Sequence, residues 1–321
     1  MWISRRHLKL GVQGAVAVAV VAAVGWHFAR LLRGNPLSDA AVTVRPGYLV
    51  ASGVCYLAAH TLFGTFFWQL LRCEGARVSW LAAVRAYFVS QAGKYVPGKA
   101  WVLVLRMMLL RSYGVSTAVV GVTGTYETLT TMAAGAAVGV ALLPWSGWSV
   151  AIGSMEWLGF LLVAVLPVVL SLFNGVLVKV VRRLRKPGST DLPSPPVWLL
   201  CVGLVQASAG WCLLAAGVGL ALMGLLPDPD AVQALAFPGL LAAVALSYVA
   251  GFASLILPGG LGARELLLQQ MLAAQLAAVG LVGAAAFGVV AALTIRLAWT
   301  AAEVVFSAGL WWVARPRGTH G

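Results

Sequence analysis

Charged residues are scarce in this sequence. Only 10% of its 321 residues are charged, whereas a soluble globular domain carries about 25%. Hydrophobic residues make up 61%, and several apolar runs reach the roughly 20 residues that a helix needs to cross a bilayer. The strict apolar–polar alternation that indicates a membrane β-barrel is missing. The composition therefore predicts an all-α polytopic membrane protein.

Acidic residues are fewer than basic ones. Nine Asp and Glu stand against 22 Lys and Arg, which gives a net charge of +13. The basic residues gather at the ends of apolar runs, as the positive-inside rule expects of cytoplasmic helix ends. This distribution explains the charge without a nucleic-acid partner, and we expect none.

Patterns typical of metal, redox and nucleotide sites are also missing. The four cysteines lie in or beside apolar runs, with neither a C-x-x-C nor a paired histidine, so we expect no metal and no cofactor. The stretch 93–99 fits G-x-x-x-x-G-K, but Ala100 stands where a phosphate loop needs Ser or Thr, and no strand precedes it. Aspartates are dispersed in connecting segments. We therefore expect no ATPase and no enzyme active site.

Two Pro-Gly breaks interrupt the apolar segments, one at Pro97-Gly98 and one at Pro258-Gly259-Gly260. Proline lacks a backbone N–H and glycine favours turns, so neither segment continues as an ordinary helix. Bare peptide groups facing lipid cost several kcal/mol each, and each break must lie within protein or beside water. The breaks stand about half the chain length apart, which suggests two related halves.

Charge bias and breaks together predict six membrane spans and two re-entrant hairpins. The expected spans are about 10–32, 47–71, 118–143, 157–178, 197–226 and 279–313, and the expected hairpins are about 78–113 and 236–275. If 78–113 crossed the membrane fully, the basic cluster at 179–186 would face outward, against the positive-inside rule. The hairpin alternative keeps that cluster inside. Both termini then face the cytoplasm, and we expect the plasma membrane.

The predicted topology forms one integral membrane domain, 1–321, built from two half-repeats. These are 1–143 and 150–313, and the segment 186–196 is the linker. Each half contains three spans and one hairpin, so the second half enters the membrane inverted. Inverted repeats with broken helices are typical of carriers, whose binding sites lie at the breaks near mid-membrane.

Charged residues gather at the two breaks and at membrane depth. A helix that starts after a break offers free N–H groups and a partial positive charge, which favour an anion. The alternative is that Glu265 only complements its own helix and Arg264 pairs with a carboxylate. Glu127, Arg296 and Glu303 are expected to form ion pairs, which either switch during function or only join helices. The candidate substrate-binding residues are Lys94, Tyr95, Pro97, Gly98, Lys99, Arg106, Pro258, Gly259, Gly260, Gly262, Arg264 and Glu265.

These motifs resemble those of a known family. Lys94-Tyr-Val-Pro-Gly98, Glu127, the stretch 258–265 and Arg296 resemble the lysylphosphatidylglycerol synthase transmembrane region, also called flippase-like, over about residues 10 to 313. The resemblance implies movement of lipids between leaflets, including aminoacylated phospholipids. Aminoacyl transfer belongs to a separate soluble domain in that family, and we expect it to be absent here because the chain ends soon after residue 313. Relatives are also associated with glycolipids and polyprenyl-phosphate sugars.

The sequence thus predicts a lipid translocase that moves a phosphate-containing lipid between leaflets without ATP hydrolysis, passively or with an ion gradient. One alternative is a non-catalytic partner of a membrane glycosyltransferase or lipid synthase. Another is an integral lipid-modifying transferase.

Overall fold

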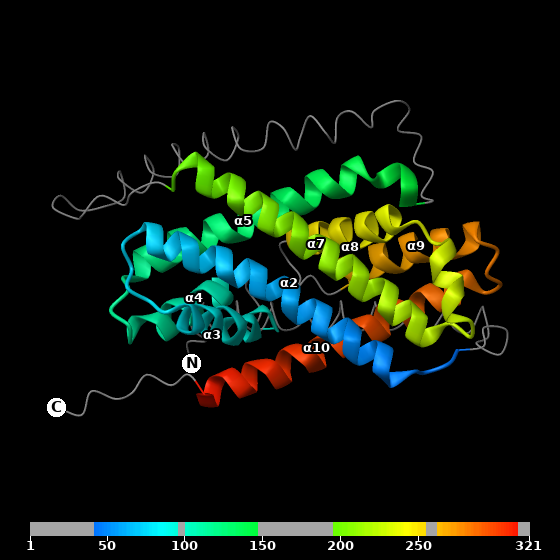
Figure 1. Ribbon diagram of the computed structural model, residues 1–321, viewed down its shortest axis with the longest axis horizontal. Helices are drawn as coiled ribbons and strands as arrows, with labels where there is room; N and C mark the ends of the chain where they lie inside the picture. Colours follow the sequence, from blue (N-terminus) through cyan, green and yellow to red (C-terminus); the bar gives the residue numbers. More distant parts are fainter. Residues whose placement is uncertain (1–41, 96–99, 147–194, 255–261, 314–321) are drawn as a thin grey trace, which may run out of the picture.

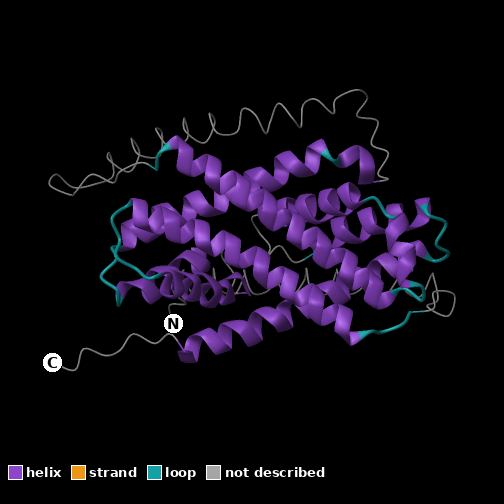
Figure 2. Cartoon of the chain, in the orientation of Figure 1, coloured by secondary structure: helices purple, strands orange, loops and turns teal. Residues whose placement is uncertain are grey.

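The computed structural model describes residues 42–95, 100–146, 195–254 and 262–313. Across these ranges the regular structure is entirely helical, which confirms the all-α class, and the connecting loops gather at the two ends of a helical bundle (Figure 2). The predicted spans at 10–32 and 157–178, most of the linker, and both Pro-Gly tips lie outside the described residues.

Four long helices run through the bundle (Figure 1). They are α2 (Pro46–Cys73), α5 (Thr117–Ala141), α7 (Val197–Leu225) and α10 (Ala284–Val313). The helices α2, α7 and most of α10 are long and apolar enough to cross a membrane. The helix α5 has 25 residues, or about 37 Å at 1.5 Å per residue, but threonines and an acid make it less apolar. All four lie where the sequence predicts spans.

The shorter helices form two pairs. One pair is α3 (Trp80–Ser90) and α4 (Ala100–Arg111), with the 3-10 turn η1 (Gln91–Tyr95) after α3; the other is α8 (Phe237–Ala253) and α9 (Ala263–Ala278). Members of a pair pack against each other, and each is shorter than the roughly 20 residues of a span. In Figure 1 the α3–α4 pair lies at the end of the bundle where α2 ends, and the α8–α9 pair lies toward the end where α2 begins. The turns η2 (Leu143–Ser146) and η3 (Pro229–Ala234) complete the described elements.

Helix starts follow local sequence signals. Ser79 caps α3, since its side chain accepts a hydrogen bond from the Ala82 N–H, and Ser116 caps α5 through the Val119 N–H. At the start of α9, Gly262 has a φ of 93°, a conformation that glycine adopts without strain. The chain can therefore turn sharply out of the second break and begin α9 at once.

Glycines at every seventh position allow α7 to approach α2 closely. A Cβ at Gly203 would lie 2.3 Å from a ring carbon of Phe66, and one at Gly210 would lie 2.3 Å from a ring carbon of Phe63. Further along, Gly217 and Gly224 face the earlier turns of α2. Close packing of small residues drives membrane helices together, because lipid supplies no hydrophobic force between them. This antiparallel contact fixes the centre of the bundle.

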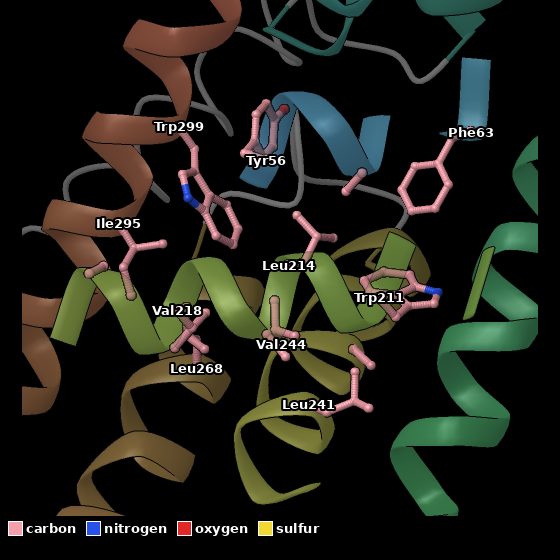
Figure 3. Close-up of a cluster of buried hydrophobic side chains, with 14 of the residues drawn as sticks. Tyr56, Phe63, Trp211, Leu214, Val218, Leu241, Val244, Leu268, Ile295 and Trp299 are labelled. Atoms are coloured by element: carbon pink, nitrogen blue, oxygen red, sulfur yellow. The ribbon is translucent and has the colours of Figure 1, made fainter. Parts of the chain in front are cut away.

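Aromatic side chains fill that centre (Figure 3). Trp211 and Trp299 are both fully buried. The Trp211 indole N–H donates to the Thr131 carbonyl at 3.0 Å, and the Trp299 N–H donates to Ser52 Oγ at 2.9 Å. Each indole therefore fills the core without leaving its N–H unsatisfied, and Trp299 brings α10 against α2.

Candidate functional site

The two pairs of short helices, α3–α4 (the first hairpin) and α8–α9 (the second hairpin), both contact α10. This helix carries Arg296 and Glu303 seven residues apart, which places both side chains on one face. Lys94, at the tip of the first hairpin, lies 2.5 Å from Glu303, and Glu265, at the start of α9, lies 3.0 Å from Arg296. Segments that are about half the chain apart in sequence thus converge within two turns of one helix, or about 10 Å.

Glu303 holds the first hairpin. Its Oε2 atom contacts Lys94 Nζ and accepts a short hydrogen bond from the Tyr56 hydroxyl of α2. The His60 ring, one turn further along α2, lies against the Tyr56 ring at a tilt of 34°, with centroids 4.0 Å apart. The Glu303 side chain is 4% exposed and that of Lys94 is 22% exposed. Lys94 is therefore the more accessible side chain of this pair, and Glu303 is enclosed.

Glu265 ties α9 to α10. Its Oε2 accepts the Gly262 N–H at 2.9 Å, and its Oε1 lies 3.0 Å from Arg296 Nη1. The second contact is an ion pair without hydrogen-bond alignment. The Glu265 carboxylate thus accepts the hydrogen bond from the Gly262 N–H, a group that we expected to be available to an external anion. For Glu265 the geometry favours the alternative in which this acid complements its own helix.

Arg264 lies in the same cluster without a carboxylate. Its guanidinium carbon is 3.6 Å from the Tyr248 ring centroid and 5.8 Å from that of Trp299. The residue is 8% exposed, and it forms no ion pair among the described residues. Within the described ranges, the carboxylate partner that the alternative requires is therefore not present. Stacking holds the planar guanidinium by its face and leaves its N–H edge for another acceptor.

A third ion pair joins α4 to α5. Arg106 Nη1 lies 3.0 Å from Glu127 Oε2, and Arg106 Nε donates to Ser90 Oγ at 3.3 Å. The guanidinium also lies over the rings of Phe67 and Tyr87. Both charged residues are at most 3% exposed. For Glu127 this sealed arrangement favours a structural ion pair over a contact with substrate.

The charges around the two hairpins do not balance within the described residues. Each of the three carboxylates has a cation: Glu303 has Lys94, Glu265 has Arg296, and Glu127 has Arg106. Arg264 is the fourth cation and leaves this set with one excess positive charge. Another buried arginine, Arg85, lies over Trp311, about two turns beyond Glu303 on α10. An interior with excess positive charge favours an anionic guest.

The structure thus brings five predicted residues together at α10: Lys94, Arg264, Glu265, Arg296 and Glu303. Arg106 and Glu127 pair with each other instead, and Gly262 is the turn before α9. Predicted residues outside the described ones are Pro97, Gly98, Lys99, Pro258, Gly259 and Gly260, together with the side chain of Tyr95.

Sequence reasoning missed three aromatic members of the site, Tyr56, Tyr248 and Trp299. For Trp299 a signal existed, because it lies three residues after Arg296 on a helix and therefore shares its face. For Tyr56 a signal also existed, because Ser52, Tyr56 and His60 follow at four-residue spacing and lie on the buried face of α2. Tyr248 lies in an apolar run beside Ser247. How both tyrosines reach the cluster at α10 follows only from the packing of α2 against α10 and of α8 against α9.

Comparison with known proteins gives a family. No curated protein matched this chain. The family model of the lysylphosphatidylglycerol synthase TM region matches residues 14–305, which covers both hairpins and all the site residues above. Helices of membrane-spanning length and composition agree with that match. The chain is therefore a multi-pass membrane protein that belongs to the family of the lysylphosphatidylglycerol synthase TM region.

Proposed function

We propose that this protein is a lipid translocase of the plasma membrane, which moves a phosphate-containing lipid between leaflets without ATP hydrolysis. The observation that carries the proposal is Arg264, the cation of the α10 cluster that no described carboxylate neutralises. It lies directly after the second Pro-Gly break, where a carrier with broken helices holds its substrate. The family membership supports a role in lipid chemistry or lipid movement.

A phosphodiester fits Arg264 in charge and in shape. An unpaired charge in a protein interior is costly, and a hydrogen-bonded partner of opposite sign reduces that cost. A guanidinium presents parallel N–H groups that match two phosphate oxygens, and Tyr248 already holds its plane. Because Arg264 has no carboxylate among the described residues, a singly charged phosphodiester would supply the counter-charge that this guanidinium lacks.

The arrangement of the short helices supports movement across the membrane. The pairs α3–α4 and α8–α9 lie toward opposite ends of the bundle (Figure 1), and Lys94 after α3 and Glu265 at the start of α9 both contact α10. We infer that each pair is a re-entrant hairpin entering from its own side, within six spans arranged as an inverted repeat. A headgroup bound between the tips could be reached from either leaflet in turn, while the acyl chains stay in the bilayer. With this topology both termini are cytoplasmic.

Lipid movement by the purified protein tests the proposal. The protein is reconstituted into phosphatidylcholine vesicles that contain a trace of a headgroup-labelled fluorescent phosphatidylglycerol, and dithionite then bleaches only the outer leaflet. A translocase lets bleaching exceed the outer-leaflet half, whereas protein-free vesicles retain the other half. A labelled phosphatidylethanolamine, a labelled glycolipid and a labelled polyprenyl-phosphate sugar, run in parallel, identify the preferred headgroup.

The same assay separates the alternatives. A non-catalytic partner of a glycosyltransferase or lipid synthase would move none of these lipids by itself. An integral lipid-modifying transferase would change the probe chemically, which thin-layer chromatography of the extracted lipids would show. Either outcome in a correctly folded wild-type protein contradicts the translocase proposal.

A further inference from the structure

Lys94 pairs with the buried carboxylate of Glu303 and is itself partly exposed. The ammonium contacts Glu303 Oε2 at 2.5 Å, and its side chain is 22% exposed against 4% for Glu303. Lys94 is therefore the partner of this pair that an anionic headgroup can contact, while the carboxylate is enclosed. Two anions then compete for one ammonium, the fixed Glu303 and the mobile phosphate.

The outcome of that competition depends on what else faces Glu303. The described groups that act on it directly are Tyr56 and His60 of α2, Tyr87 of α3, Tyr248 of α8 and Lys94 of η1. Two further cations act on Lys94, Arg264 of α9 and Arg296 of α10. Arg296 is paired with Glu265, and in the loaded state Arg264 faces the lipid phosphate. Among the described residues, hydrogen bonds to the carboxylate come from Tyr56 and Lys94. If the phosphate takes Lys94, Glu303 keeps one neutral donor. A buried carboxylate without a cation is strongly disfavoured in its ionised form and takes up a proton instead.

We propose that Glu303 is a proton-binding site and that this protein carries one proton with each lipid anion. The inference rests on the proposed lipid translocation and adds its driving force. In the loading step the Lys94 ammonium exchanges Glu303 for the lipid phosphate, and a proton from water binds the freed carboxylate; no covalent bond of the lipid changes. In the release step the phosphate leaves, the carboxyl loses its proton to the same side, and Lys94 pairs with Glu303 again.

Charge is conserved at the site in this cycle. One negative charge arrives on the phosphodiester and one positive charge arrives as the proton, so the loaded and empty sites carry the same net charge. A lipid anion and a proton together are neutral. Transport is therefore independent of membrane potential, and at equilibrium an imposed difference of one pH unit gives about a ten-fold difference in lipid between leaflets. The lipid accumulates in the leaflet that faces the more alkaline side.

The experiment measures leaflet asymmetry under an imposed pH difference. Phosphatidylcholine vesicles with labelled phosphatidylglycerol carry the wild-type protein, Glu303→Gln, Glu303→Asp or Glu74→Gln, and potassium with valinomycin holds the membrane potential at zero. Glu74 is the matched control because it lies outside the spans and burial raises its pKa to about 7. It is thus another carboxyl that titrates in the working range.

We expect wild-type, Glu303→Asp and Glu74→Gln proteins to reach about ten-fold asymmetry per pH unit. Glu303→Gln resembles the protonated acid. We expect this variant to move lipid until both leaflets hold equal amounts, whatever the imposed pH difference. Wild-type protein that moves lipid but leaves the leaflets equal would overturn proton coupling and leave the translocase proposal intact. Loss of asymmetry in Glu74→Gln with its retention in Glu303→Gln would also overturn it. Wild-type protein that moves no lipid contradicts the proposed function itself.

Discussion

The buried pair of Arg106 and Glu127 makes the sharpest stability prediction. The substitution Glu127→Gln keeps the side-chain shape and removes only the negative charge. Among the described residues, Arg106 would then be a buried cation with Ser90 as its remaining polar contact and Phe67 and Tyr87 against its faces. Removing one partner of a buried pair costs about 3–5 kcal/mol in the free energy of unfolding. We expect about 3 kcal/mol, because the glutamine carbonyl still accepts a hydrogen bond and the aromatic contacts persist.

A double-mutant cycle separates this pair from a general loss of packing. We expect Arg106→Met and Glu127→Leu each to be costly alone, because each leaves the other buried charge without its partner. The double variant Arg106→Met, Glu127→Leu removes both charges and fills a similar volume, and we expect it to lie within about 1 kcal/mol of wild type. Unfolding by SDS in mixed micelles measures the four free energies.

The cycle also has a clear contrary result. If Glu127→Gln costs less than about 1 kcal/mol, the pair is solvated and the ion pair does not hold α4 to α5 as described. If the costs of the two single charge removals simply add in the double variant, the side chains do not interact. Lipid movement by the Glu127→Gln protein, measured per folded molecule, then reports whether the pair also affects function.

Three further predictions concern packing, pH and topology. Gly210→Ala places a methyl group against an aromatic ring of α2 and should lower the thermal midpoint in detergent, whereas Gly219→Ala meets its nearest neighbour at 3.7 Å and should be neutral or stabilising; equal effects would contradict the close α2–α7 contact. Burial raises the pKa of Glu74 from 4.5 to about 7. The folded protein therefore keeps its full stability below pH 4.5 and loses stability as the pH rises through 7, where this buried group must ionise. We expect Glu74→Gln to raise the thermal midpoint at pH 8 relative to wild type and not at pH 5, and an equal shift at both pH values would contradict this cause. In a cysteine-free background, an impermeant maleimide added to intact cells should label Asp228→Cys and spare Arg77→Cys, and the reverse pattern would invert the proposed topology.

The sequence predicted the helices well and their mutual contacts poorly. The expected span at 197–226 is α7 at Val197–Leu225, and the expected hairpins contain α3–α4 and α8–α9 in the right order. Length, apolar content and Pro-Gly breaks are local properties, and they determine where a membrane helix begins and ends. The six-span count and the re-entrant character of the hairpins stay predictions.

The choice of ion-pair partners could not be read from the chain. The sequence indicated that buried acids and bases would pair, but the pairs Lys94–Glu303 and Arg106–Glu127 depend on which helices pack together. The same limit applies to Arg264, whose stacking on Tyr248 requires α8 and α9 to lie side by side. The seven-residue glycine spacing of α7 was visible, but its meaning depends on the phenylalanines of α2.

The rate of phosphatidylglycerol movement in vesicles by Arg264 variants tests the central claim most directly. A charge-assisted hydrogen bond contributes about 1.5–3 kcal/mol, so we expect Arg264→Ala to slow movement about ten- to one-hundred-fold at equal amounts of folded protein. Arg264→Lys should keep part of the rate, because lysine retains the positive charge but lacks the parallel N–H groups of the guanidinium. Arg77→Ala, at an exposed arginine of the α2–α3 turn, should move lipid at the wild-type rate. A folded Arg264→Ala protein as fast as wild type would contradict the claim that this guanidinium binds the lipid phosphate.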